Sequence, residues 1–321
     1  MDTNKTKAEQ FFTKPVHIFL IAVVCTLLWG SACPSIKSGY ELFQIGADAI
    51  GSKIIFAGFR FSLAGIVTLL ATFVIQRRVV FLTRKNYKGI LLLGFLQTFV
   101  QYYFFYLALG KMTGSKGSII NATSTFMIVI LSHFFFQADR LNVRKIIGCV
   151  LGFLGIVIIS VTGEEKLGFA MDQEGFMLMA SFSFAIGSII SKIITQQEDP
   201  MVTTGYQMTF GGILLVIVGF LKQGAIGVIT WKGSLLFAYM VLLSAVAFTL
   251  WSMLLKYNFV GNISIYNSLN PVFGTILSGI ILGENVVNLK NMVALVCVAG
   301  GIYIVNRVKP QKAEMVSRVE G

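Results

Sequence analysis

Acidic residues are scarce in this sequence, and their placement argues against one kind of chemistry. Asp and Glu number 14 among 321 residues, and charged residues of both signs make up 12%, about half the share found in soluble domains. No Asp or Glu lies in the middle of a long apolar segment. Because proton relays inside membranes usually employ such carboxylates, we expect no proton coupling through an acidic side chain.

Histidine and cysteine are too few and too widely spaced to form a metal site. There are 2 His and 4 Cys, and no CxxC spacing occurs. Cys25, Cys33, Cys149 and Cys297 fall inside or at the ends of apolar segments, which is not the pattern of a disulfide framework. We predict no disulfide, no metal and no cofactor.

Motifs for energy conversion and for catalysis are missing as well. The phosphate-binding pattern GxxxxGK[ST], which ATP-driven transport within a single chain requires, does not occur. The two His and the loop carboxylates are too far apart in the sequence to assemble an acid–base site. We therefore predict no catalytic residue and no enzymatic activity.

Long apolar segments dominate the sequence instead. Hydrophobic residues make up 55% of the chain, and its mean hydropathy is +0.79. The apolar residues recur in segments of roughly 20, the length at which a helix crosses the hydrocarbon core of a bilayer. The predicted spans are residues 16–36, 54–75, 89–109, 117–136, 146–162, 175–194, 203–221, 234–255, 263–282 and 291–306. The sequence thus predicts an all-α integral membrane protein with ten transmembrane helices.

Basic residues lie in the short connections between these spans. They do not form the aromatic-interleaved stripe of a nucleic-acid surface, so we predict no nucleic-acid partner. With the N-terminus inside, the cytoplasmic connections hold roughly twice as many Lys and Arg as the opposite ones, in line with the positive-inside rule. We expect a multi-pass protein of the inner or plasma membrane with both termini cytoplasmic and a first span that is retained.

An internal repeat fixes the predicted architecture. When residues 118–158 are placed over 264–304 without a gap, Ser118 falls on Ser264, and Asn121 falls on Asn267. Apolar residues match by chance between any two membrane helices, so the polar pairs carry the weight. The repeat is what a duplicated unit of five helices produces.

The first two helices of each half extend the repeat. Residues 29–37 (WGSACPSIK) match 184–192 (FAIGSIISK), and Arg60 lies over Gln207. Because five helices separate the copies, each helix and its counterpart run in opposite directions. We predict two inverted repeats, residues 1–163 and 164–321, whose use is alternating access to a central site.

Several motifs together resemble the EamA-type permeases of the drug/metabolite transporter superfamily. They are Trp29-Gly30-Ser31 with Lys37, the Arg60-Phe61 pair that begins an R-F-x-x-A-G segment, and Pro271-Val272-Phe273 followed by Leu282-Gly283-Glu284. The first half departs from the family pattern, with Thr125 in place of the proline and residues 137–140 reading QADR where LGER is common.

This resemblance implies a bundle with helices five and ten at its periphery and the other helices around a central cavity. It also implies transport of small molecules, for which we expect export or exchange of metabolites such as amino acids. A cationic multidrug exporter is the main alternative, and an integral-membrane enzyme acting on lipid-linked substrates is a weaker one. Substrate identity does not follow from the fold.

Arg60 is the sharpest candidate for a substrate-binding residue. An ionisable side chain within an apolar span costs a few kcal/mol and usually faces a cavity or a partner. The alternative is that Arg60 snorkels to the interface. We expect the cavity or partner, and infer from the cationic and aromatic residues of the spans that the solute carries a carboxylate or another anion.

The other candidates are amide and aromatic side chains within the spans. Each has a structural alternative, namely hydrogen bonding between helices for the amides and packing for the aromatic rings. These further candidates are Trp29, Tyr103, Asn121, Tyr206, Gln207, Trp251, Asn267 and Asn270.

Small residues and prolines predict how some of the helices pack and bend. Gly148 and Gly152 form a GxxxG motif in span five, which favours close packing either onto the bundle or across a homodimer. Pro34 and Pro271 each interrupt an apolar span and are expected to shape the cavity or a gate.

Overall fold

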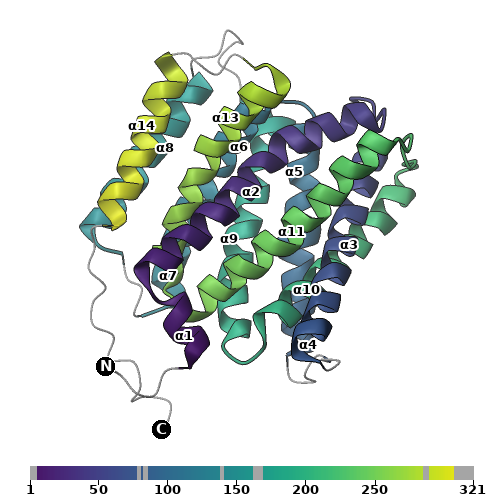
Figure 1. Ribbon diagram of the computed structural model, residues 1–321. Coiled ribbons are helices and arrows are strands. Elements are labelled where there is room, and N and C mark those ends of the chain that lie inside the picture. Colours follow the sequence, from purple (N-terminus) through teal and green to yellow (C-terminus); the bar gives the residue numbers. More distant parts are fainter. Residues whose placement is uncertain are drawn as a thin grey trace.

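The computed structural model describes residues 6–77, 81, 86–137, 141–161, 169–284 and 289–306, and these residues contain helices but no strand (Figure 1). The first half contains α1 (Lys7–Phe12), α2 (Pro15–Leu42), α3 (Ile50–Gln76), α4 (Tyr87–Leu93), the π-helix η1 (Gly94–Val100), α5 (Gln101–Leu109), α6 (Gly114–Asn121), α7 (Thr123–Phe135) and α8 (Val143–Val161). The second half contains the π-helix η2 (Met171–Gly175), α9 (Phe176–Thr195), α10 (Pro200–Leu221), α11 (Trp231–Tyr257), α12 (Val260–Ser264), the 3-10 helix η3 (Ile265–Leu269), α13 (Asn270–Leu282) and α14 (Leu289–Asn306).

Within the described ranges, 8 helical stretches are long and apolar enough to cross a bilayer. The all-helical membrane architecture is therefore confirmed. The predicted spans 146–162 and 291–306 coincide with two further helices, α8 and α14, which are not among these 8. The boundary between the predicted halves, at residues 163 and 164, lies outside the described residues.

The outer surface of the bundle is rich in large apolar side chains. Val74 is 71% exposed, Phe134 75% and Ile280 74%. Such a surface is costly in water but matches hydrocarbon, where these side chains contact lipid tails. Hydrophobicity therefore places the helices in the membrane, and the contacts between them depend on close packing and hydrogen bonds.

Helices α3 and α10 pack against each other through glycine. Both helices carry glycines at seven-residue spacing, which keeps them on one helix face: Gly51, Gly58 and Gly65 on α3, and Gly205, Gly212 and Gly219 on α10. A Cβ atom added at Gly58 would lie 2.6 Å from the backbone N of Val216, and one added at Gly212 would lie 2.4 Å from that of Ser62. The two backbones are in direct contact, so no side chain fits between them.

Helices α8 and α14 form a second close pair at one edge of the bundle (Figure 1). A Cβ atom added at Gly301 of α14 would lie 2.6 Å from the carbonyl oxygen of Gly148. The GxxxG face of span five therefore packs onto α14 of the same chain, and the peripheral place expected for helices five and ten is observed.

The interruptions of the helices differ from those expected at the prolines. Pro34 lies within α2, which runs without a break, whereas Pro271 lies at the start of α13, directly after η3. Sequence reasoning missed the break at Ala122, between α6 and α7. In the internal repeat, residues 119–123 match 265–269, so spans four and nine are interrupted at equivalent places.

The glycine contact makes a testable prediction for stability. Gly212→Ala forces a Cβ against the backbone of α3, and overpacking of this kind costs roughly 1–3 kcal/mol. We expect a lower melting temperature for this variant in detergent, measured by the fluorescence of thermal unfolding. The matched control is Gly300→Ala, because no described atom lies within 4 Å of the Cβ position at Gly300. Equal melting temperatures for the two variants would show that α3 and α10 separate easily.

Candidate functional site

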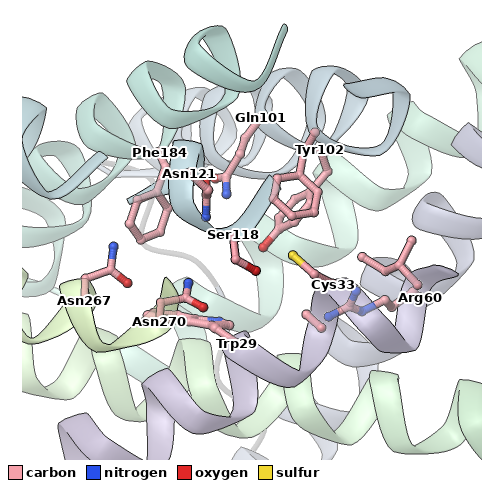
Figure 2. Close-up of a pocket in the computed structure, with 13 residues that line it drawn as sticks. Trp29, Cys33, Arg60, Gln101, Tyr102, Ser118, Asn121, Phe184, Asn267 and Asn270 are labelled. Atoms are coloured by element: carbon pink, nitrogen blue, oxygen red, sulfur yellow. The ribbon is translucent and has the colours of Figure 1, made fainter. Parts of the chain in front are cut away.

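A cavity lies between the helices and is drawn in Figure 2. It measures about 510 Å³ when its open mouth is included, and residues from both halves of the chain surround it. The lining residues are Trp29, Ala32, Cys33, Ile36, Arg60, Gln101, Tyr102, Phe105, Ser118, Asn121, Phe184, Asn267 and Asn270. None of these side chains is acidic, and Arg60 is the one cation among them.

Arg60 is held inside the bundle and does not snorkel. Its side chain is 1% exposed. The Nε atom donates to the carbonyl oxygen of Met240 at 3.2 Å and to Ser244 Oγ at 3.0 Å, and Nη1 donates to the hydroxyl of Tyr106 at 2.9 Å. Three helices, α3, α5 and α11, thus meet at one guanidinium group.

The partners of this guanidinium are all neutral. Arginine stays protonated in proteins, so the partners stabilise its charge without cancelling it. In the part of the chain that the structure describes, no carboxylate lies within ion-pair distance of Arg60 and no hydrogen bond is made by its Nη2 atom. Arg60 therefore has donors left for a ligand in the cavity.

Four other lining residues carry buried polar atoms that have no hydrogen-bond partner in the structure. They are Trp29 Nε1, Gln101 Oε1, Ser118 Oγ and Asn267 Oδ1. Leaving a buried polar atom unsatisfied costs about 1–3 kcal/mol, and such atoms are rare in proteins. Four of the ten such atoms among the described residues belong to this lining, so the cavity offers hydrogen-bonding groups to a polar ligand or water.

Aromatic rings form the apolar part of the lining. Trp29 and Phe184 lie edge to face with their ring centroids 5.9 Å apart, and Trp251 lies behind Trp29 at 5.0 Å. On the other side, the ring of Tyr102 lies 3.9 Å from that of Phe61. Rings that pack in this way are worth about 0.5–1.5 kcal/mol per pair beyond their burial, which keeps the walls of the cavity in place.

Charged groups gather outside the cavity, at an end of the bundle. The Lys111 ammonium lies 2.5 Å from an Asp172 carboxylate oxygen, and this hydrogen bond and charge raise the pKa of Lys111. Glu284, which follows the end of α13, accepts hydrogen bonds from the backbone N–H of Gly114 at 2.8 Å and of Ser115 at 3.1 Å. Its carboxylate caps the N-terminus of α6, where the helix dipole favours negative charge.

The predicted candidates divide into two groups. Trp29, Arg60, Asn121, Asn267 and Asn270 lie together in the lining, and Trp251 is adjacent through its contact with Trp29. Figure 2 shows Arg60 near one end of the lining and Asn267 near the other.

The remaining three candidates lie outside the lining. Gln207 is buried, and its Oε1 accepts a hydrogen bond from Thr98 at 2.8 Å, which ties α10 to η1. Tyr206 packs beside the cluster of Ile90, Leu93 and Ile194. The ring of Tyr103 contacts Phe99 and Phe104.

Five lining residues with an amide, hydroxyl or aromatic side chain are not among the predicted candidates: Gln101, Tyr102, Phe105, Ser118 and Phe184. Two of them had a signal in the repeat, since Ser118 matches Ser264 and Phe184 matches Trp29. Gln101 stands directly before a run of aromatic residues in α5, and a lone amide in such a run is a reason to expect an inward-facing position.

Comparison with known proteins gives a consistent result. The model of the EamA-like transporter family matches residues 17–161 and again residues 174–307. The chain is 24% identical over 256 residues to the uncharacterized transporter YetK of Bacillus subtilis, and this alignment covers 77% of this chain and 76% of YetK. It is 26% identical over 306 residues to the uncharacterized transporter YvbV of the same organism, covering 92% and 94% of the two chains.

One relative has a more specific name, and one solved structure shares the fold. A probable amino-acid metabolite efflux pump of Salmonella typhimurium is 26% identical over 302 residues, covering 88% of this chain and 93% of that protein. A crystal structure superimposes with a TM-score of 0.73 at 16% identity and covers 91% of this chain and 97% of its own. The two family matches span most of the described helices, and we conclude that this chain belongs to the EamA-like transporter family and is a multi-pass membrane transporter.

Proposed function

We propose that this protein moves small metabolites that carry a carboxylate, such as amino acids, through the cavity at Arg60, as an exporter or exchanger. The observation that carries the proposal is a buried guanidinium with neutral partners only. A charge inside a membrane protein costs a few kcal/mol unless it is paired. A carboxylate of the solute supplies the missing counter-charge, and the bidentate geometry of Arg suits that group.

The same charge disfavours the alternative of a cationic multidrug exporter. A cation about 4 Å from Arg60 meets a repulsion of about 4 kcal/mol at an effective dielectric constant of 20. The lining contains no acidic side chain that offsets it. It also contains no His and no carboxylate for acid–base catalysis, which makes a membrane enzyme the weaker alternative.

The named relative supports both the solute class and the direction. The Salmonella protein is described as a probable amino-acid metabolite efflux pump, and it aligns with nearly the full length of this chain. Export of an amino acid agrees with a cavity that contains one guanidinium, several amides and an aromatic wall.

We further propose ten membrane-spanning helices in two inverted halves, which include α8 and α14. The alignment of Arg60 with Gln207 places Gly58 on Gly205 and Gly65 on Gly212, and these glycines form the contact of α3 with α10. Helices two and seven thus meet through equivalent residues, which a pseudo-two-fold axis between the halves explains. The distribution of Lys and Arg supports a cell-membrane location with both termini cytoplasmic.

Two lysines at equivalent positions support alternating access. Lys37, near the end of α2, donates to the carbonyl oxygen of Met112, directly after span three. Lys192, near the end of α9, donates to the carbonyl oxygens of Lys256 at 2.9 Å and Asn258 at 3.0 Å. These two residues lie at the C-terminal end of α11, the helix of span eight. Each lysine therefore joins the first helix of its half to the connection that follows the third.

The two lysine contacts lie at opposite ends of the bundle. Asn258 donates to the carbonyl oxygen of Phe12, which precedes the start of α2 at Pro15, whereas Lys37 lies near the other end of α2. We propose that the Lys37 contact closes one face of the cavity and the Lys192 contact closes the other. Alternating access then consists of releasing one contact while the other is kept.

The role of Arg60 predicts a loss of transport. We expect Arg60→Gln to reduce uptake of radiolabelled neutral amino acids into proteoliposomes at least tenfold, because a charge-assisted hydrogen bond is worth about 1.5–3 kcal/mol. Arg60→Lys is expected to retain part of the activity. Arg77→Gln is the control, since Arg77 caps the far end of the same helix. Unchanged uptake by a folded Arg60→Gln variant would contradict the proposal.

The lysine contacts predict opposite changes in access to Cys33, a residue of the cavity lining. In a variant that has Cys33 as its one thiol, Lys37→Met is expected to speed modification by a membrane-impermeant thiol reagent from one side of the membrane. Lys192→Met is expected to speed it from the other side. Reaction is compared in intact cells and inverted vesicles, with Cys33→Ala as the blank. Acceleration from the same side by both variants would contradict two opposed gates.

A further inference from the structure

A short helical segment precedes the first long helix of each half of the chain. Helix α1 ends at Phe12 and α2 begins at Pro15, while the π-helix η2 leads directly into α9. With six residues, α1 is too short to be a stable helix on its own. Its contacts with the rest of the bundle therefore hold it in place.

The contacts of α1 lie at the C-terminal end of α11 (Figure 1). The ring of Phe12 stacks on that of Tyr257, with the centroids 5.7 Å apart and 10° between the ring planes. The side chain of Asn258 donates to the carbonyl oxygen of Phe12 at 3.0 Å and to that of Leu254 at 2.9 Å. The backbone carbonyl of the same asparagine accepts the hydrogen bond of Lys192. Asn258 therefore joins α1 to the lysine contact at this end of the bundle.

The contacts of η2 are ionic and lie on the connection between α5 and α6. Lys111 pairs with Asp172 at 2.5 Å, and these side chains are 44% and 49% exposed. Lys116 pairs with Glu174 at 2.6 Å, where the side chains are only 23% and 11% exposed. The Glu174 carboxylate also accepts the backbone N–H of Ala170 at 3.0 Å. Because water and salt screen a sheltered pair less than an exposed one, the Glu174 pair is the stronger of the two.

The two sets of contacts fall on equivalent positions of the internal repeat. The ungapped alignment of spans four and nine, continued upstream, places Met112 on Asn258 and Lys111 on Tyr257. The carbonyl oxygens of Met112 and Asn258 accept the hydrogen bonds of the two lysine gates. Lys111 is bound by η2, and Tyr257 is bound by α1. The segment before the first helix of each half thus binds the connection after the third helix of the other half.

We infer that α1 and η2 are two straps, each of which holds closed the lysine gate at its own end of the bundle. This inference rests on the gates of the proposed function and adds to each gate a contact between the two halves. A face of the cavity opens only when its lysine contact and its strap are both released. Phe12 and Glu174 are then positioning residues, because they fix the connection that a gating lysine binds.

The test measures access to Cys33 in the full-length protein that has Cys33 as its one thiol, with a membrane-impermeant maleimide on intact cells and inverted vesicles. Phe12→Ala is expected to speed modification roughly two- to tenfold from the side that Lys192→Met opens, the range that one ring pair provides. Glu174→Gln is expected to speed it roughly two- to tenfold from the side that Lys37→Met opens. Rates from the other side stay unchanged in each case, whereas a general loss of packing raises both.

Two matched controls lie beside the straps. Phe11→Ala removes a ring of the same size from α1, but Phe11 is 48% exposed and has no described ring contact with α11. Glu41→Gln makes the same change of charge near the end of α2, where Glu41 is exposed and forms no described ion pair. Both controls are expected to leave the rates unchanged, and the second also corrects for the effect of charge on the reagent.

A double variant tests whether the strap acts through its lysine. With Phe12→Ala and Lys192→Met combined, the rate is expected to equal that of Lys192→Met alone, since residues that act through one contact are not additive. Multiplication of the two separate effects would show that α1 acts independently of the gate and would overturn the inference.

The outcomes separate the straps from the gates. Unchanged access in folded Phe12→Ala and Glu174→Gln variants, with both lysine variants acting from opposite sides, overturns the straps and leaves the gates standing. Acceleration from both sides by either strap variant also overturns the straps. Lysine variants that fail to act from opposite sides overturn the gates of the proposed function themselves.

Discussion

The hydrogen bonds that hold the Arg60 guanidinium are the interaction on which the rest of the site depends. They join α3 to α5 and α11 through neutral oxygens, so they fix the cation without neutralising it. The glycines make this placement possible. At 3.6 residues per turn, Gly58 and Gly65 share one face of α3 and Arg60 lies on the opposite face. Close contact with α10 on the first face leaves the second free for the cavity.

The pseudo-symmetry of the chain accounts for the walls of the cavity but not for its charge. Trp29 and its repeat counterpart Phe184 both line the cavity and contact each other. Arg60 and its counterpart Gln207 have diverged, since Gln207 is used to bond Thr98. Glu284 caps α6, and the motif that contains it, LGE at residues 282–284, reads QAD at residues 137–139 of the first half. In the proposed transport of a carboxylate between two inverted halves, a single cation holds the solute in one orientation, whichever face is open.

Sequence reasoning succeeded where one physical rule allowed one outcome. Apolar length predicted the helices. An arginine or an amide in an apolar span has to face protein, and Arg60, Asn121, Asn267 and Asn270 do so in the lining, whereas Gln207 does so in the contact of α10 with η1. Aromatic side chains are stable against lipid and protein alike, so nothing in the sequence separated Tyr103 from Tyr102. The break at Ala122 was missed because no proline or glycine marks it.

The chemistry of the lining also bears on the energy source of transport. The lining residues that the structure describes include no carboxylate, and in the proposed transport we take the gradient of the solute itself as the driving force. The zwitterion of an amino acid has no net charge, so the membrane potential does no work on it as it crosses. For a simple anion, the same crossing changes the free energy by about 2.3 kcal/mol per 100 mV. When the proposed carrier reorients without solute, Arg60 has no counter-charge in the cavity. Reorientation of the carrier with bound solute is therefore the easier step. An exchange of one amino acid for another avoids the empty step, and this favours exchange when solute is present on both sides.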